Sequence, residues 1–105
     1  MQVDIQRLGG FLLELDDASQ VKALFLLRLL EASRLPFLPA PHGEKVEKDL
    51  YALLIKTKLN VRLYYTVSGS KAVMLCGIYK GQQKIPAQVL RHCRQLIAQI
   101  RMEGA

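Results

Sequence analysis

The chain has no tryptophan and few residues of the types that build metal centres or disulfide frameworks. Its 105 residues include two cysteines, Cys76 and Cys93, and two histidines, His42 and His92. The spacing of these residues fits no zinc motif. We therefore expect no metal site, no bound cofactor and two reduced thiols. Reduced thiols are the usual state of cysteine in the cytoplasm, where we expect the protein to act.

Long apolar runs are also absent. The longest candidate, residues 23–30, is interrupted by Arg28 and is too short to cross a membrane, so we read it as a buried helix. The N-terminus carries Asp4 and no cleavage-site pattern, and we expect no secretory signal. Half of the residues are hydrophobic, which is typical of a folded chain, and the length allows one domain over residues 1–105.

Acidic residues are scarce in the second half of the chain. Residues 1–50 hold six Lys or Arg and eight Asp or Glu, a net charge of −2. Residues 51–105 hold nine Lys or Arg and one acid, Glu103, a net charge of +8. A basic face of this kind indicates a polyanionic partner such as nucleic acid. A nuclease with so few carboxylates would be metal-independent and limited to RNA, whose 2′-hydroxyl is an internal nucleophile.

Apolar residues recur at helical spacing in the N-terminal part, which predicts a pair of helices. The first covers residues 4–15, with apolar positions at Ile5, Leu8, Leu12 and Leu15. The second covers residues 18–33 and is apolar around most of its circumference, as is typical of a helix that packs on two sides. Three prolines and Gly43 mark residues 34–49 as a connection.

Three apolar segments separated by short turns predict a three-stranded antiparallel sheet. The strands cover residues 50–56, 61–67 and 71–79, and Ser-Gly-Ser at residues 68–70 is a tight hairpin signal. Pro86 suits the first turn of a helix, which we expect to end near residue 102. The prediction is therefore an α+β domain with an N-terminal helical pair, a three-stranded antiparallel sheet and a C-terminal helix.

Arg62 lies in the centre of the middle strand, on the same predicted face as Tyr64 and Thr66. An arginine is costly to bury without a partner, so we expect it to face a polar cleft or solvent. The strand ends bring further cations near it, namely Lys56, Lys58, Lys80 and Lys84. Such a cluster can bind phosphates and can stabilise the negative charge of a phosphoryl-transfer transition state.

The last helix and the strand tyrosines supply further candidates. Arg91 and Arg94 lie off the apolar face of the helix and add positive charge. His92 can act as an acid or a base in RNA cleavage, although its position beside the apolar face of the helix favours a structural histidine. Tyr64 can stack on a base or can simply be a strand residue. The sequence contains no Gly-rich phosphate loop, G-x-S-x-G or H-E-x-x-H motif.

Three segments carry a family resemblance. They read DLYALL at residues 49–54, VRLYY at residues 61–65 and LCGIYKGQQKIP at residues 75–86. These resemble the G-L-x-E-L-R strand, the Y-R-x-x-Y strand and the lysine-rich run before the last helix in the HigB-like, phage-derived host-killing branch of the RelE/ParE toxin superfamily. The lysine-rich run with its closing proline is the most specific part. The resemblance extends over about residues 11–100.

The resemblance implies a RelE/ParE toxin-like fold and a ribosome-dependent mRNA endonuclease that a small helix-turn-helix antitoxin neutralises. The basic residues that carry over are Arg62, Lys80 and Lys84. The arginine of the family's G-L-x-E-L-R strand falls on Leu54. The second lysine of its lysine-rich run falls on Gly81, and a position that is often histidine falls on Cys76. Its usual N-terminal strand is not evident before residue 4. Lys56 and Lys58 are the nearby cations that would replace the missing charges.

Two functions are compatible with these residues. The first is a toxin that cleaves translated mRNA, with Arg62, Lys80, Lys84 and His92 as catalytic candidates. Its RNA-binding candidates are Lys56, Lys58, Tyr64, Arg91 and Arg94. The second is a non-enzymatic protein of the same fold, which blocks gyrase as ParE-like toxins do or binds a partner or RNA. The missing charges at Leu54 and Gly81 favour this alternative.

Overall fold

A computed structural model describes residues 1–79 and 84–104 of the chain. It contains five strands, three α-helices and one short 3-10 helix within those residues. In chain order the elements are β1 (Gln2–Asp4), η1 (Gln6–Leu8), α1 (Gly9–Glu14), α2 (Asp17–Ala32), β2 (Gly43–Glu47), β3 (Leu50–Lys56), β4 (Asn60–Ser68), β5 (Lys71–Tyr79) and α3 (Ala87–Gly104).

The sheet corrects the fold that the sequence predicted. Its strand order is β1–β5–β4–β3–β2, so it has five strands instead of three. β1 pairs with β5 in parallel, and the other neighbouring strands are antiparallel. The predicted helix over residues 4–15 is replaced by β1, η1 and α1. The fold is α+β, but the three-stranded antiparallel sheet and the simple helical pair were wrong.

Both missed strands lie at the edges of the sheet. β1 has three residues, and the five residues of β2 include Glu44, Lys45 and Glu47. Short, charged edge strands protect a sheet from pairing with other chains, and they lack the apolar alternation by which strands are found. β1 is an N-terminal strand of the kind that the family resemblance implied, and it was not evident from the sequence.

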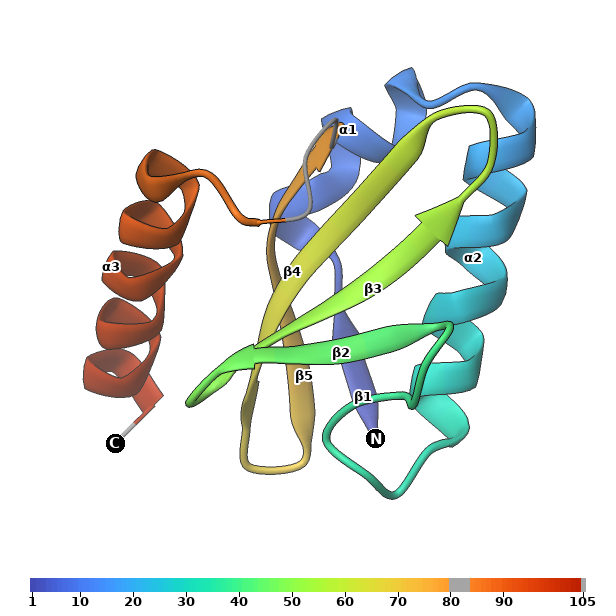
Figure 1. The fold of residues 1–105 in the computed structure, drawn as a ribbon. Coiled ribbons are helices and arrows are strands. Elements are labelled where there is room, and N and C mark those ends of the chain that lie inside the picture. The colour runs from blue at the N-terminus through green and yellow to red at the C-terminus, as the bar shows by residue number, and fades with distance from the viewer. Residues whose placement is uncertain (80–83, 105) are drawn as a thin grey trace.

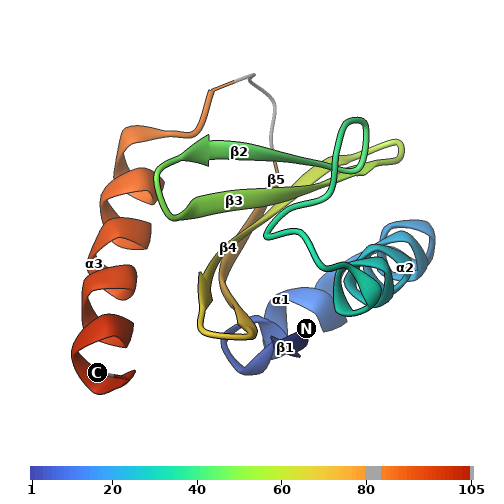
Figure 2. The same ribbon diagram turned by 90° about the horizontal axis from the view of Figure 1, so that it is seen from below.

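Two cores lie on opposite faces of the sheet, because alternate strand residues point to opposite sides. One core lies between the sheet and η1, α1 and α2, and it contains Leu63, Tyr65 and Met74. The other lies between the sheet and α3, and it contains Tyr64 and Cys93. Figures 1 and 2 show the sheet between α3 on one side and the N-terminal helices on the other.

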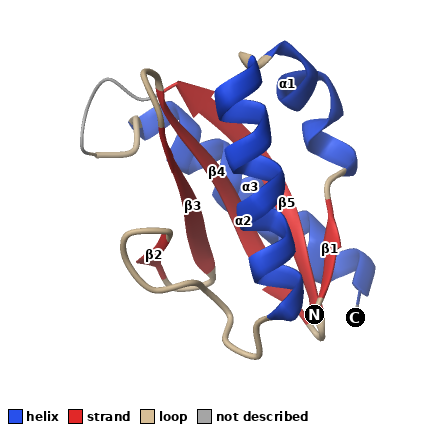
Figure 3. Ribbon diagram, turned by 90° about the vertical axis from the view of Figure 1, so that its right-hand side faces the viewer, coloured by secondary structure: helices blue, strands red, loops and turns tan. Residues whose placement is uncertain are grey.

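The helices are held in different ways. Asp16 caps α2, because its carboxylate accepts a hydrogen bond from the backbone N–H of Ser19. α2 crosses the sheet in front of β4 and β5, and α3 lies behind them (Figure 3). Two ion pairs join α3 to the β2–β3 hairpin, Arg94 with Glu47 and Arg101 with Asp49. Polar contacts at the hairpin therefore supplement the apolar contacts that α3 makes with the sheet.

Candidate functional site

Arg62 lies near the start of β4, between Leu54 of β3 and Ile78 of β5 in the strand register. Its side chain is 19% exposed and forms an ion pair with the Glu44 carboxylate of β2. A charge that has lost most of its water needs a partner, and Glu44 supplies it. Glu44 is itself 41% exposed, so water can solvate its carboxylate if a ligand takes its place on the guanidinium.

A pocket of about 380 Å³ lies beside this ion pair. Its walls come from β2, from β4 and from the segment that leads into α3. The lining residues are Glu44, Lys45, Val46, Arg62, Tyr64, Lys84, Ile85 and Leu90. The structure thus brings together two cations that the sequence predicted, Arg62 and Lys84. Lys80, the third predicted catalytic cation, lies outside the described residues.

Glu44 is the pocket residue that sequence reasoning missed. The charge count placed it in the acidic first half of the chain, in a stretch read as a solvated connection. In the structure β2 pairs with β3, and this pairing brings a carboxylate next to Arg62 of β4. In the structure Lys45 is exposed between the half-buried Glu44 and Val46, an alternation that the charged sequence of β2 does not reveal.

The predicted helix candidates lie apart from the pocket. Arg91 and His92 are exposed on α3, and neither lines the pocket, whereas the preceding Leu90 does. His92 is therefore not positioned beside Arg62. Arg94 donates two hydrogen bonds to the Glu47 carboxylate, at 2.8 and 2.7 Å. Arg94 thus joins α3 to β2, which is a structural role.

The Arg94–Glu47 pair predicts a pH-dependent contribution to stability. The hydrogen bonds from Arg94 lower the pKa of Glu47 below its ordinary value of 4.5. A depressed carboxyl pKa stabilises the fold above the unfolded-state pKa, and this contribution disappears as the pH falls. Wild type should therefore exceed Arg94→Gln in unfolding free energy near neutral pH by a small amount, as for exposed ion pairs. Urea titrations should show this difference shrinking between about pH 6 and about pH 3. A constant difference would contradict the role of the pair.

Lys56 and Lys58 lie at the β3–β4 turn, close to Arg62 along the strands. Lys56 pairs with Asn60 in the register, two residues from Arg62, and both lysines are exposed. Neither lines the pocket. They therefore add positive charge outside the pocket. They do not replace, inside it, the cations that the family resemblance implied.

Tyr64 is fully buried, which corrects its predicted role as a base-stacking residue. Its ring lies in the core beneath α3, and its hydroxyl has no hydrogen-bond partner among the described residues. Burial raises the pKa of Tyr64 to about 12, so the hydroxyl stays protonated near neutral pH and keeps its O–H donor. Tyr64 also lines the pocket with Arg62.

Tyr64→Phe separates a structural from a ligand-binding role of this hydroxyl. Removing a buried donor that lacks a partner should raise the free energy of unfolding by roughly 1 kcal/mol. If the hydroxyl serves a bound phosphate, the same variant should bind RNA several-fold more weakly. Chemical denaturation and RNA titration of the same preparation measure both effects. A stabilised variant with unchanged RNA affinity would remove Tyr64 from the site.

Comparison with known families identifies the family of the chain. A profile for the family described as phage-derived protein Gp49-like matches residues 10–98, which is most of the sequence. The chain belongs to this Gp49-like family. No curated protein matches the sequence. The finer assignment to the HigB-like branch stays a prediction, because the match is to the Gp49-like family as a whole.

In this Gp49-like chain, the position of the toxin family's strand arginine lies directly beside Arg62. That position is Leu54, which pairs with Arg62 across β3 and β4 and packs against the core under α3. An arginine there would have stood next to Arg62 on the face of the sheet that α3 covers. The pocket of this Gp49-like protein therefore has fewer cations than the resemblance implied.

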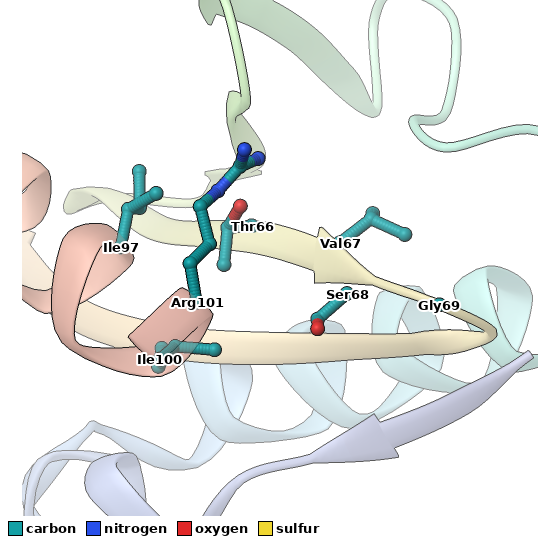
Figure 4. A pocket seen from close by; sticks show the side chains of 7 residues that line it. All are labelled: Thr66, Val67, Ser68, Gly69, Ile97, Ile100 and Arg101. Atoms are coloured by element: carbon teal, nitrogen blue, oxygen red, sulfur yellow. The ribbon is translucent and has the colours of Figure 1, made fainter. Parts of the chain in front are cut away.

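A second pocket lies at the other end of α3. Its volume is about 210 Å³, and it is lined by Thr66, Val67, Ser68, Gly69, Ile97, Ile100 and Arg101 (Figure 4). Arg101 is joined to Asp49 by an ion pair of 3.0 Å. Thr66 is buried, and its hydroxyl has no partner within the described part of the chain. None of the residues that the sequence singled out for catalysis lies here.

The described part of the Gp49-like chain has neither a metal-binding cluster nor a membrane-spanning helix. Residues 1–79 and 84–104 contain no cluster of three or more His, Cys, Asp or Glu side chains that could hold a metal ion. No helix in those ranges combines the length and apolar character that a membrane span requires.

On α2, the apolar side chains of Val21, Leu24 and Phe25 are exposed, with exposed fractions of 68%, 49% and 49%.

Proposed function

We propose that this Gp49-like protein is the toxin of a type II toxin–antitoxin pair and that it cleaves translated mRNA at the Arg62 pocket without a metal ion. The observation that carries the proposal is the placement of three cations, Arg62, Lys84 and Lys45, in the lining of one pocket. A cluster of cations suits a phosphodiester. The phage-derived family and the basic second half of the chain support a nucleic-acid target.

The chemistry follows from the groups that line the pocket. The scissile phosphate takes the place of the Glu44 carboxylate on the Arg62 guanidinium. Arg62 and Lys84 then stabilise the extra negative charge that develops as the 2′-hydroxyl attacks phosphorus and the bond from phosphorus to the 5′-oxygen breaks. The departing 5′-oxygen takes a proton from water. The attacking oxygen must lose its proton. Glu44, displaced from Arg62 but still in the pocket, is the carboxylate placed to accept it.

Glu44→Gln tests this assignment. The variant keeps the size of the side chain but loses the proton acceptor, so RNA cleavage should fall by about 10²-fold or more. RNA affinity should be retained or should rise, because Arg62 no longer has an ionic competitor. Single-turnover cleavage and filter binding measure the two quantities. Glu47→Gln is the matched control, because Glu47 pairs with Arg94 outside the pocket, and it should cleave as wild type does. Equal loss in both variants would remove Glu44 from the chemistry.

We propose a helix-turn-helix antitoxin as the protein partner. The exposed apolar side chains of α2, Val21 and Phe25, offer it a contact surface on the opposite side of the sheet from α3. A surface of exposed apolar side chains on a helix is typical of an interaction site. The sequence does not identify the antitoxin.

Induced expression with and without the neighbouring open reading frame tests the function as a whole. The proposal predicts growth arrest with new 5′ ends inside translated messages, and rescue by the neighbouring frame. Growth arrest with intact messages would instead favour the non-enzymatic alternative, and a DNA supercoiling assay would then show whether gyrase is blocked. One observation favours the non-enzymatic alternative: Leu54 pairs with Arg62 at the position where the toxin family has an arginine.

A further inference from the structure

Cys76 and Cys93 lie in different elements, and their side chains meet between α3 and the sheet. Cys76 lies on β5 and Cys93 on α3, and their sulfur atoms are 3.6 Å apart. A disulfide bond is about 2.05 Å long, so a small movement of the two side chains would bring the sulfurs to bonding distance. Both cysteines are free thiols in this structure.

The sheet is shaped so that Cys76 faces the helix. A register shift lies between the pairs Tyr64–Cys76 and Tyr65–Met74, which leaves Leu75 without a direct partner. As a result both Leu75 and Cys76 pack into the core on the α3 side, although they are adjacent in a strand. Without this irregularity, neighbouring residues would point to opposite faces.

The two thiols differ in exposure and in acidity. Cys76 is half-buried, and Cys93 is fully buried. A hydrogen bond joins the two sulfurs at 3.6 Å, and this contact lowers the pKa of Cys76 and raises the pKa of Cys93. Thiolates react with oxidants, whereas thiols do not. Cys76 therefore has the features of the reacting sulfur, and Cys93 those of the sulfur that resolves the product.

We propose that Cys76 and Cys93 are a peroxide-responsive dithiol whose oxidation joins α3 covalently to β5. The Cys76 thiolate attacks one peroxide oxygen, the O–O bond breaks, and the departing hydroxide takes a proton to become water. The Cys93 sulfur then displaces hydroxide from the resulting sulfenic acid, its proton completes a second water, and the S–S bond forms. Two thiols are oxidised by two electrons, and one hydrogen peroxide is reduced. A dithiol reductant reverses the link.

The link would fix one wall of the Arg62 pocket. α3 carries Leu90 into that wall, one turn before Cys93, and Lys84 and Ile85 lie in the segment that leads into the helix. The oxidation chemistry does not depend on what the pocket binds. Its test is therefore independent of the proposed function.

Hydrogen peroxide treatment of the reduced, full-length protein tests the proposal. After denaturation in the presence of N-ethylmaleimide, wild type should show a mass loss of about 2 Da and no alkylated thiol. It should run as a monomer on a non-reducing gel. Its melting temperature should rise by about 5 °C or more, because the link closes a loop in the unfolded chain. Dithiothreitol should reverse each change.

Two variants distinguish the pair from an ordinary exposed cysteine. Cys93→Ala removes the resolving thiol, so the remaining cysteine should gain oxygen, by about 32 Da for the sulfinic acid, instead of losing hydrogen. Cys76→Ser should leave the buried Cys93 unmodified at the same peroxide dose. The proposal is overturned if wild type retains both alkylatable thiols at a dose that oxidises Cys93→Ala, or if the only disulfide formed joins two chains. A link that lowers the melting temperature would equally overturn it.

Discussion

Replacing Arg62 with alanine is expected to lower the rate of RNA cleavage by about 10²- to 10³-fold, the usual effect of removing one group that stabilises transition-state charge. The loss should appear in the cleavage step measured at saturating protein, because the guanidinium is needed most when the phosphate gains charge. The fold should persist, since the carboxylate left behind, Glu44, is 41% exposed and can be solvated by water.

Two further variants make this experiment specific. Arg62→Lys keeps the charge but loses the planar, bidentate geometry, so its rate should fall between those of wild type and Arg62→Ala. Arg91→Ala removes an exposed arginine of α3 outside the pocket, and it should cleave almost as wild type does. Full activity of Arg62→Ala, or equal losses in Arg62→Ala and Arg91→Ala, would show that the pocket is not the catalytic site.

Leu63→Ala is expected to have the largest effect on stability, with a loss of about 3 kcal/mol in the free energy of unfolding. Leu63 lies in the central strand β4, is fully buried and belongs to the core under the N-terminal helices. Truncation leaves a cavity, and the neighbouring strands β3 and β5 prevent it from collapsing. Urea denaturation measures the change, and a loss under about 1 kcal/mol would contradict the described packing.

The matched control for this substitution is Leu13→Ala. Leu13 lies in α1, and its side chain is 79% exposed, so the same truncation should change stability by less than about 0.5 kcal/mol. The pair of leucines therefore tests which side of the N-terminal helices faces the sheet. Equal effects of the two substitutions would indicate that α1 packs in a different orientation.

The central strands were predictable because their residues are apolar and their turns are short. β3 spans Leu50–Lys56, where the sequence placed a strand, and β5 spans Lys71–Tyr79. The edge strands were not predictable. β2 carries charged residues that resemble a loop, and β1 is held by only three residues paired with β5. Their stability comes from pairing with a neighbour distant in sequence, which local periodicity does not show.

The candidate site was predictable in part for the same reason. Period-2 alternation placed Arg62 and Tyr64 on one face of β4, and both line the pocket. It did not show that α3 covers Tyr64 completely or that β2 brings Glu44 to Arg62. Charge counted along the chain separated acids from bases, whereas the sheet brings them together. The fold decides which residue pairs with a charged side chain, and the local sequence does not show it.

The most direct test is the chemistry of the RNA ends that the purified protein makes on messages bound to translating ribosomes. We predict a 2′,3′-cyclic phosphate at the upstream product, and no cleavage when the nucleotide before the scissile phosphate lacks its 2′-hydroxyl. Cleavage that leaves a 3′-hydroxyl at the upstream product, or that proceeds at a 2′-deoxy position, would contradict attack by the 2′-hydroxyl at the Arg62 pocket.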